Sequence, residues 1–165
     1  MTSLKTKKNR KQIKTLLVPV LEEHIWPLLQ PEGFSWRRSL RFWRGNPSVR
    51  QTLEFGLEMP RQRTCPVLAY IRPWITVRIP GIGEQTRKLT GEEKRTGDAD
   101  IVLHQPAGRV GPDRADTRWL LFNEEDLSDL GHSLAKYVKA YVLPFLNRYQ
   151  TSRDIVEGWE TGDER

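Results

Sequence analysis

The sequence contains a single cysteine, Cys65, among its 165 residues. It can therefore form no disulfide within the chain and no cysteine metal cluster, which fits a reducing compartment. No run approaches the ~20 apolar residues that a membrane-spanning helix requires. The basic first residues are not followed by the apolar segment of a signal peptide. These absences predict a cytoplasmic protein without a membrane segment.

Histidines are also few, and none has a second ligand at a metal-binding spacing. His24, His104 and His132 lie far apart in the sequence, so we expect no histidine metal site. The glycine-containing segments 81–83 and 108–111 lack the lysine and the strand–turn–helix context of a phosphate-binding loop. We therefore expect turns at both segments, and the sequence predicts no cofactor, no metal site and no catalytic residue.

What the chain does contain is positive charge, with a net charge of +6. Residues 1–50 carry 11 Lys and Arg against 3 acidic residues, whereas residues 123–165 carry 5 against 9. A basic first third and an acidic last third indicate either attraction to a polyanion or self-complementary packing and solubility. The composition alone leaves both interpretations open.

The clearest helical pattern runs from Asn123 to Leu143. Its apolar residues recur at steps of three and four, the spacing of one helical face, at Leu127, Leu130, Leu134, Val138 and Tyr141. Asn123 can accept a hydrogen bond from a free backbone N–H, and residues 124–126 place acidic side chains beside the positive end of the helix dipole. This segment predicts an amphipathic helix with one face on a core.

A second amphipathic helix is expected near the N-terminus. Residues 1–12 form a flexible basic lead that frays before the helix, and the apolar pattern then runs from Ile13 to Leu29. Pro19 lacks a backbone donor and predicts a kink or break near Val18, while Pro27 and Pro31 end the element.

In the middle of the chain the apolar period changes from about 3.6 to 2, which indicates half-buried strands. We expect strands at residues 34–42, 50–58, 69–79 and 118–122. Pro73 cannot donate to a ladder, so its position is expected at an edge or a bulge. Residues 80–117 read as a long polar loop, and loops of that length are commonly functional or disordered. The loop is therefore a candidate binding segment.

Together these elements predict an α+β fold, an antiparallel four-stranded meander-like sheet with N-terminal and C-terminal helices packed on one face. A single domain spans residues 13–159, including a short last helix capped by Thr151 or Ser152, and residues 160–165 form a frayed tail.

Five short segments resemble an uncharacterised family of small bacterial proteins, the domain of unknown function catalogued as number 4304. They are the leading helix running into Pro31-Glu32-Gly33-Phe34, Phe42-Trp43-Arg44, the alternating strand after it, the Trp119 segment before an acidic helix start, and Leu143-Pro144-Phe145-Leu146. The resemblance covers roughly residues 8–158. It departs from the family pattern in the polar insert 81–116, implies the α+β arrangement and transfers no catalytic residue.

One exposed strand face gathers arginines and tryptophans and forms the candidate binding surface. Its residues are Arg37, Arg41, Trp43, Arg50, Arg72, Trp74 and Arg78. Such a face suits single-stranded nucleic acid, because phosphates take the charge and bases stack on the rings. Alternatively, a helix or the long loop covers the tryptophans and the arginines lie over them. Trp and Arg are also favoured anchors for a protein partner.

An enzyme would require a constellation of reacting groups. Glu54 and Glu58 share the outward face of one strand and could serve a hydrolase, but no downstream strand lysine completes a nuclease-like set. We therefore expect a non-enzymatic binding domain with a protein or another macromolecule as its partner. Single-stranded nucleic acid binding and hydrolysis remain the alternatives, and the oligomeric state is not predicted.

Overall fold

The computed structural model describes residues 9–62, 65–91 and 100–161. Six antiparallel strands form one sheet in the order β1-β2-β3-β4-β5, and β6 pairs with β4 on the same side as β5. Their bounds are β1 (Ser35–Trp36), β2 (Arg41–Gly45), β3 (Arg50–Glu58), β4 (Ala69–Arg78), β5 (Ile101–Pro106) and β6 (Trp119–Leu121).

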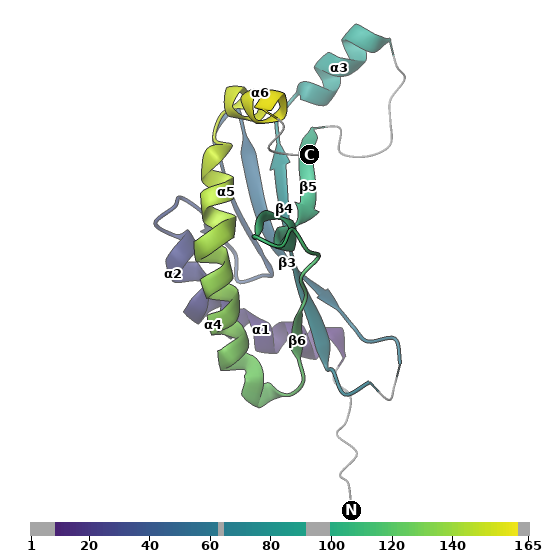
Figure 1. Cartoon of the computed structure of the whole chain (residues 1–165), viewed down its shortest axis with the longest axis vertical. Coiled ribbons are helices and arrows are strands. Elements are labelled where there is room, and N and C mark those ends of the chain that lie inside the picture. Colours follow the sequence, from purple (N-terminus) through teal and green to yellow (C-terminus); the bar gives the residue numbers. More distant parts are fainter. Residues whose placement is uncertain (1–8, 63–64, 92–99, 162–165) are drawn as a thin grey trace, which may run out of the picture.

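The helices are α1 (Arg10–His24), α2 (Trp26–Leu29), α3 (Ile82–Thr90), α4 (Leu127–Tyr137), the π-helical turn η3 (Val138–Val142), α5 (Leu143–Arg148) and α6 (Ser152–Thr161). Two 3₁₀ turns, η1 (Ala107–Val110) and η2 (Glu124–Asp126), complete the elements. Figure 1 shows α4 and α5 as one long rod beside the sheet, with α1 and α2 on the same side and α3 projecting beyond the end of the sheet.

This arrangement confirms the α+β class and the placement of helices on one face, but the predicted count of four strands is wrong. The first expected strand is split into β1 and β2 by a turn in which Arg38 adopts a positive φ of 48°. The indole N–H of Trp36 donates to the Ser39 carbonyl across this turn, at 2.8 Å. The additional strand β5 lies inside the segment expected to be a loop.

The core lies between the helices and the inward face of the sheet. Alternate residues of β3 are buried, including Leu53 and Phe55, and they meet Leu17 of α1 and Leu134 of α4 in one apolar cluster. The apolar residues that recur with a period of two in the strands and of 3.6 in the helices therefore form the buried faces of these elements, as the sequence predicts.

Pro73 lies inside β4, where it pairs with Phe55 of β3. The Phe55 N–H donates to Leu40 on the opposite side of β3, so this pair exchanges no hydrogen bonds and the Pro73 nitrogen faces away from β3. On that side the β6 ladder ends at Ile71 and the β5 ladder begins at Trp74. The proline therefore occupies a local edge, where a missing donor costs no ladder hydrogen bond.

The other prolines interrupt the helices less than expected. α1 runs unbroken through Pro19, because Thr15, whose carbonyl loses its donor, lies on the exposed side of the helix. At Pro144 the chain forms the π turn η3, in which the Leu143 N–H bonds to Val138, and the rod continues to Arg148. The extra residue in this turn buries Val142, while Tyr141, expected on the core face, is 36% exposed.

The boundaries of the expected segments also change. Residues 1–8 of the predicted basic lead lie outside the described residues, whereas Arg10–Gln12 already form the first turn of α1, capped by Asn9 and Gln12. The segment 80–117 contains α3, β5 and η1 and is not a loop throughout, although residues 92–99 lie outside the described part. α6 runs through Thr161, and residues 162–165 of the expected tail are not described.

Candidate functional site

The sheet face opposite the helices carries the candidate binding surface. The register places Arg41, Glu54 and Trp74 side by side, and Gly45, Arg50 and Arg78 four residues further along. Arg37 reaches the same face from the turn after β1, with its guanidinium carbon 5.6 Å from the centroid of the Trp43 ring. All seven predicted residues therefore share one face: Arg37, Arg41, Trp43, Arg50, Arg72, Trp74 and Arg78.

Trp74 is the centre of a stack on this face. The Arg72 guanidinium lies 4.5 Å from the centroid of the Trp74 ring, and the His104 ring of β5 packs nearly parallel to the indole at 4.7 Å. His104 in turn shares a 2.9 Å hydrogen bond between its Nδ1 and the Thr76 hydroxyl. Trp74 is half-buried, while His104 is exposed.

Two of the arginines are held by carboxylates. Arg72 donates two hydrogen bonds to Asp116, at 2.7 and 2.6 Å, and lies 3.5 Å from Glu58. Arg41 donates to Glu54 at 3.0 and 2.6 Å. The bidentate geometry fixes the Arg72 guanidinium in place over Trp74, which matches the interpretation in which arginines lie over the tryptophans, whereas both Arg41 hydrogen bonds go to the same oxygen of Glu54.

The remaining arginines lie at two places, Arg37 beside Trp43, and Arg50 opposite Arg78 at one end of the face. Near this end the backbone N–H groups of Gly81 and Gly83 hold the pKa of Asp100 below its usual value, with a smaller contribution from Arg50. With Arg118, which pairs with Glu58, six arginines on this face stand against the carboxylates of Glu54, Glu58, Asp116 and Asp100. The face therefore carries more positive than negative charge.

The carboxylates proposed for a hydrolase do not form a pair. Glu54 and Glu58 are four residues apart on β3, which corresponds to about 13 Å along the strand, and each lies in its own ion pair with arginine. Paired catalytic carboxylates typically lie about 5–9.5 Å apart. The geometry gives this alternative no support.

The histidines are closer than the sequence indicates. The expectation that they lie apart is wrong for His24 and His132, whose ring centroids are 4.5 Å apart where α1 packs on α4. The long sequence separation between them concealed this contact. No cluster of three or more potential metal ligands occurs among the described residues. None of the helices within those residues has the length and apolarity needed to cross a membrane.

Comparisons with protein-family models, curated proteins and solved structures find no match. Its resemblance to the domain of unknown function 4304 therefore stays a prediction, and the functional argument depends on the geometry of its surfaces.

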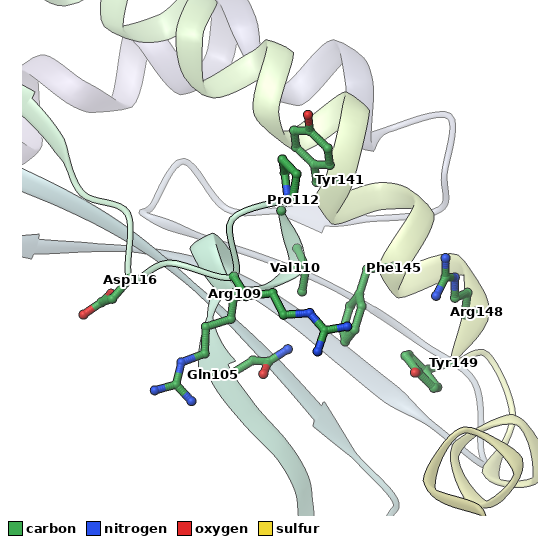
Figure 2. A pocket seen from close by; sticks show the side chains of 11 residues that line it. Gln105, Arg109, Val110, Pro112, Asp116, Tyr141, Phe145, Arg148 and Tyr149 are labelled. Atoms are coloured by element: carbon green, nitrogen blue, oxygen red, sulfur yellow. The ribbon is translucent and has the colours of Figure 1, made fainter. Parts of the chain in front are cut away.

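A second surface feature was missed by the sequence analysis. A cavity of about 660 Å³ lies between the β5–η1 segment and the rod formed by η3 and α5. Figure 2 shows Arg109 and Gln105 on one side of it, with Phe145, Arg148 and Tyr149 on the helical side. These residues come from two segments with no common period, so no pattern in the sequence marks them; the interpretation of 80–117 as a binding segment was the nearest signal.

Proposed function

We propose that the protein is a non-enzymatic, macromolecule-binding domain that uses the open face of its sheet. The residues of the candidate binding surface favour single-stranded nucleic acid. The observation that supports this proposal most is the concentration of arginines and stacked rings on a sheet face that no helix among the described residues covers. Phosphates and bases are the complementary chemistry for such a face.

The rings offer sites for base stacking. His104 of β5 continues the Arg72–Trp74 stack, and its exposure leaves the imidazole available to a base. Trp43 lies in the same register row as His104, through Thr52 and Thr76. A single strand that crosses this row meets one ring on β2 and another on β5.

The charges offer sites for phosphate. Arg37 stacks on Trp43 and makes no ion pair with any described residue, and Arg50 lies opposite Arg78 at one end of the face. The ion pair of Arg41 with Glu54 is exposed, and pairs of this kind contribute about 0–1 kcal/mol. Exchange of a carboxylate for a phosphate there has a low free-energy cost.

Fluorescence anisotropy with a labelled oligothymidylate of about 12 nucleotides, a length within the site sizes of such proteins, tests the proposal. We expect affinity to fall steeply as salt rises, because each phosphate contact releases a counterion. Arg37→Ala and Arg50→Ala should each weaken binding and make the salt dependence shallower by about 0.7.

Arg153→Ala is the matched control, because Arg153 is exposed on α6 and pairs with Glu157 away from the sheet face. It should bind like the wild type. Binding that does not respond to salt, or that falls equally in the control variant, would contradict the proposal.

A protein partner, the main expectation from the sequence, is here the second candidate and is supported by two exposed apolar side chains at β6. Leu120 is 44% and Phe122 45% exposed, and among the described residues β6 pairs with β4 on one side and with no strand on the other. An exposed edge strand with apolar side chains suits addition of a strand from a partner.

Affinity capture distinguishes this candidate from the first. A partner that binds here should be retained by the wild type and by Arg50→Ala, and lost from a variant that carries both Leu120→Lys and Phe122→Lys. Retention of the same partner by the double variant would exclude this edge as its binding site.

A further inference from the structure

The cavity beside α5 lies where the helices leave the inward face of β5 partly uncovered. Leu103 and Gln105 of β5 are half-buried, whereas the inward residues of β3 and β4 are fully buried. The volume of about 660 Å³ falls within the ~300–1,000 Å³ of small-molecule sites. The space is large enough for a ligand the size of a nucleotide.

Arginines from both sides line this space. Arg109 comes from η1, Arg114 from the loop after it, and Arg148 from the last turn of α5. Neither Arg109 nor Arg148 forms an ion pair with any described residue, and both are exposed. The one carboxylate in the lining is Asp116, which is already engaged by Arg72 at 2.7 and 2.6 Å. Arg109 and Arg148 therefore bring positive charge to the cavity that Asp116, engaged by Arg72, does not pair with.

Aromatic rings form the helical wall. Phe145 and Tyr149 pack edge to face with ring centroids 5.0 Å apart, and Tyr141 stands exposed one turn earlier on the rod. Figure 2 shows the Phe145 ring between the Arg109 side and Tyr149. Gln105 faces this wall and makes no hydrogen bond with a described residue, so its amide offers both a donor and an acceptor.

The wall formed by η1 is fixed to the rod. The Tyr137 hydroxyl donates to the carbonyls of Ala107 and Gly108, at 3.2 and 3.0 Å. Gly111 lies directly against the same hydroxyl, and a Cβ at this position would overlap it. The arginines therefore project from a positioned backbone, which reduces the ordering cost of binding.

We propose that this cavity binds a nucleoside phosphate. Guanidinium groups pair with phosphate through parallel hydrogen bonds, and a phosphate dianion balances two arginines better than a single carboxylate does. The half-buried ring of Phe145, packed against the buried Tyr149, provides a surface for a base, and the Gln105 amide matches the donors and acceptors on a base edge. The site lies on the helix side of the sheet and is independent of the sheet-face proposal.

Isothermal titration calorimetry of the full chain tests the proposal with AMP, GMP, CMP and UMP, and with adenosine and inorganic phosphate as partial ligands. We expect at least one nucleoside monophosphate to bind, and adenosine and phosphate to bind at least about tenfold more weakly. Arg109→Gln and Arg148→Gln should each lower the affinity about 10- to 100-fold, the effect of a lost charged hydrogen bond.

Both substitutions are at exposed positions, so the variants should keep the wild-type circular dichroism spectrum. Arg153→Gln, on α6 and paired with Glu157, is the matched control and should leave the affinity unchanged. Arg37→Ala with Arg50→Ala should also leave it unchanged, which separates this site from the sheet face.

Three results would overturn the proposal. The first is that no nucleoside monophosphate binds at millimolar concentration. The second is that inorganic phosphate binds as tightly as the nucleotide. The third is that Arg109→Gln and Arg148→Gln bind the nucleotide with the same affinity as the wild type.

Discussion

Gly131 on α4 faces His24 on α1 so closely that a Cβ at position 131 would overlap the imidazole ring. The same Cβ would lie 2.8 Å from Val20 Cγ1, and His24 is further held by the His132 ring at 4.5 Å. The lack of a side chain at Gly131 therefore allows α1 and α4 to pack closely together.

Gly131→Ala should therefore destabilise the protein, although alanine is the better helix former by about 1 kcal/mol. Overpacking typically costs about 1–3 kcal/mol, so we expect a net loss in the free energy of unfolding measured by urea denaturation. Lys136→Ala, at an exposed position of the same helix, is the control and should change little. A stabilised Gly131→Ala variant would show that α1 and α4 adjust without strain.

Leu134→Ala tests the core face of α4. Leu134 is 1% exposed, so its truncation should lower the free energy of unfolding by about 2–5 kcal/mol. Leu89 on α3 provides the matched helical control because it is 88% exposed. Leu89→Ala should cost less than about 0.5 kcal/mol. Similar losses in the two variants, measured by chemical denaturation, would contradict the burial of this face.

The observed burial shows how much of the fold the periodicity of apolar residues predicts. The alternation in β3 and β4 and the Asn123 cap are local features, and the structure confirms them: Asn123 accepts a hydrogen bond from the Glu125 N–H at 2.9 Å. The helical period fails at Tyr141 because Pro144 is accommodated by a π turn, which shifts the buried position by one residue. Proline predicts a disturbance, but the packing decides its form.

The features that the sequence did not predict, β5 and the cavity, depend on contacts between segments far apart in the chain. β5 is half-exposed on both faces, so its residues show no clear alternation, and its pairing with the long strand β4 gives it its structure. The cavity is harder still to predict, because Arg109 and Arg148 meet only through the packing of η1 on the rod. The Arg/Trp face could be predicted, since a period of two places residues on one side, but its ion pairs with Asp116 could not.

Gln51 of β3 is a buried polar residue whose side chain binds backbone carbonyls at the C-terminal end of α5. Its Nε2 donates to the carbonyls of Leu146 and Tyr149, at 2.7 and 2.6 Å, while its Oε1 accepts from Arg44 at 2.7 Å. Gln51→Leu keeps the approximate volume but leaves these partners without a hydrogen bond. We expect a loss of about 1–3 kcal/mol in the free energy of unfolding, the cost of an unsatisfied buried group.

A double-mutant cycle separates this network from simple packing. Gln51→Leu and Arg44→Leu should be non-additive by more than about 0.5 kcal/mol, because each removes the partner of the other. Gln51→Leu combined with Arg153→Gln, which lies in a separate ion pair, should be additive. Additivity in the first cycle would show that the Arg44–Gln51 hydrogen bond contributes nothing to stability.

Asp154 makes the stability of the last helix, α6, depend on pH. Its carboxylate accepts hydrogen bonds from the backbone N–H groups of Thr151 and Gln150, at 2.7 and 3.1 Å, at the start of α6. The Thr151 side chain, followed by these N–H groups, holds the pKa of Asp154 below its ordinary value of 3.8. A carboxyl whose pKa is depressed by folding stabilises the folded state above its unfolded pKa, and this contribution disappears as the pH falls through the folded value.

We therefore expect the difference in unfolding free energy between wild type and Asp154→Ala to be constant above about pH 5 and to shrink as the pH falls below about 4, near the unfolded pKa of aspartate. Titration of the Asp154 carboxyl carbon by NMR measures the same effect directly and should give a midpoint below 3.8. In Thr151→Val the hydroxyl is lost while the backbone donors remain, so the midpoint should rise towards the ordinary value. A wild-type midpoint at or above that value would mean that the N–H groups of Thr151 and Gln150 do not hold the charged carboxylate, and α6 would then begin without this cap.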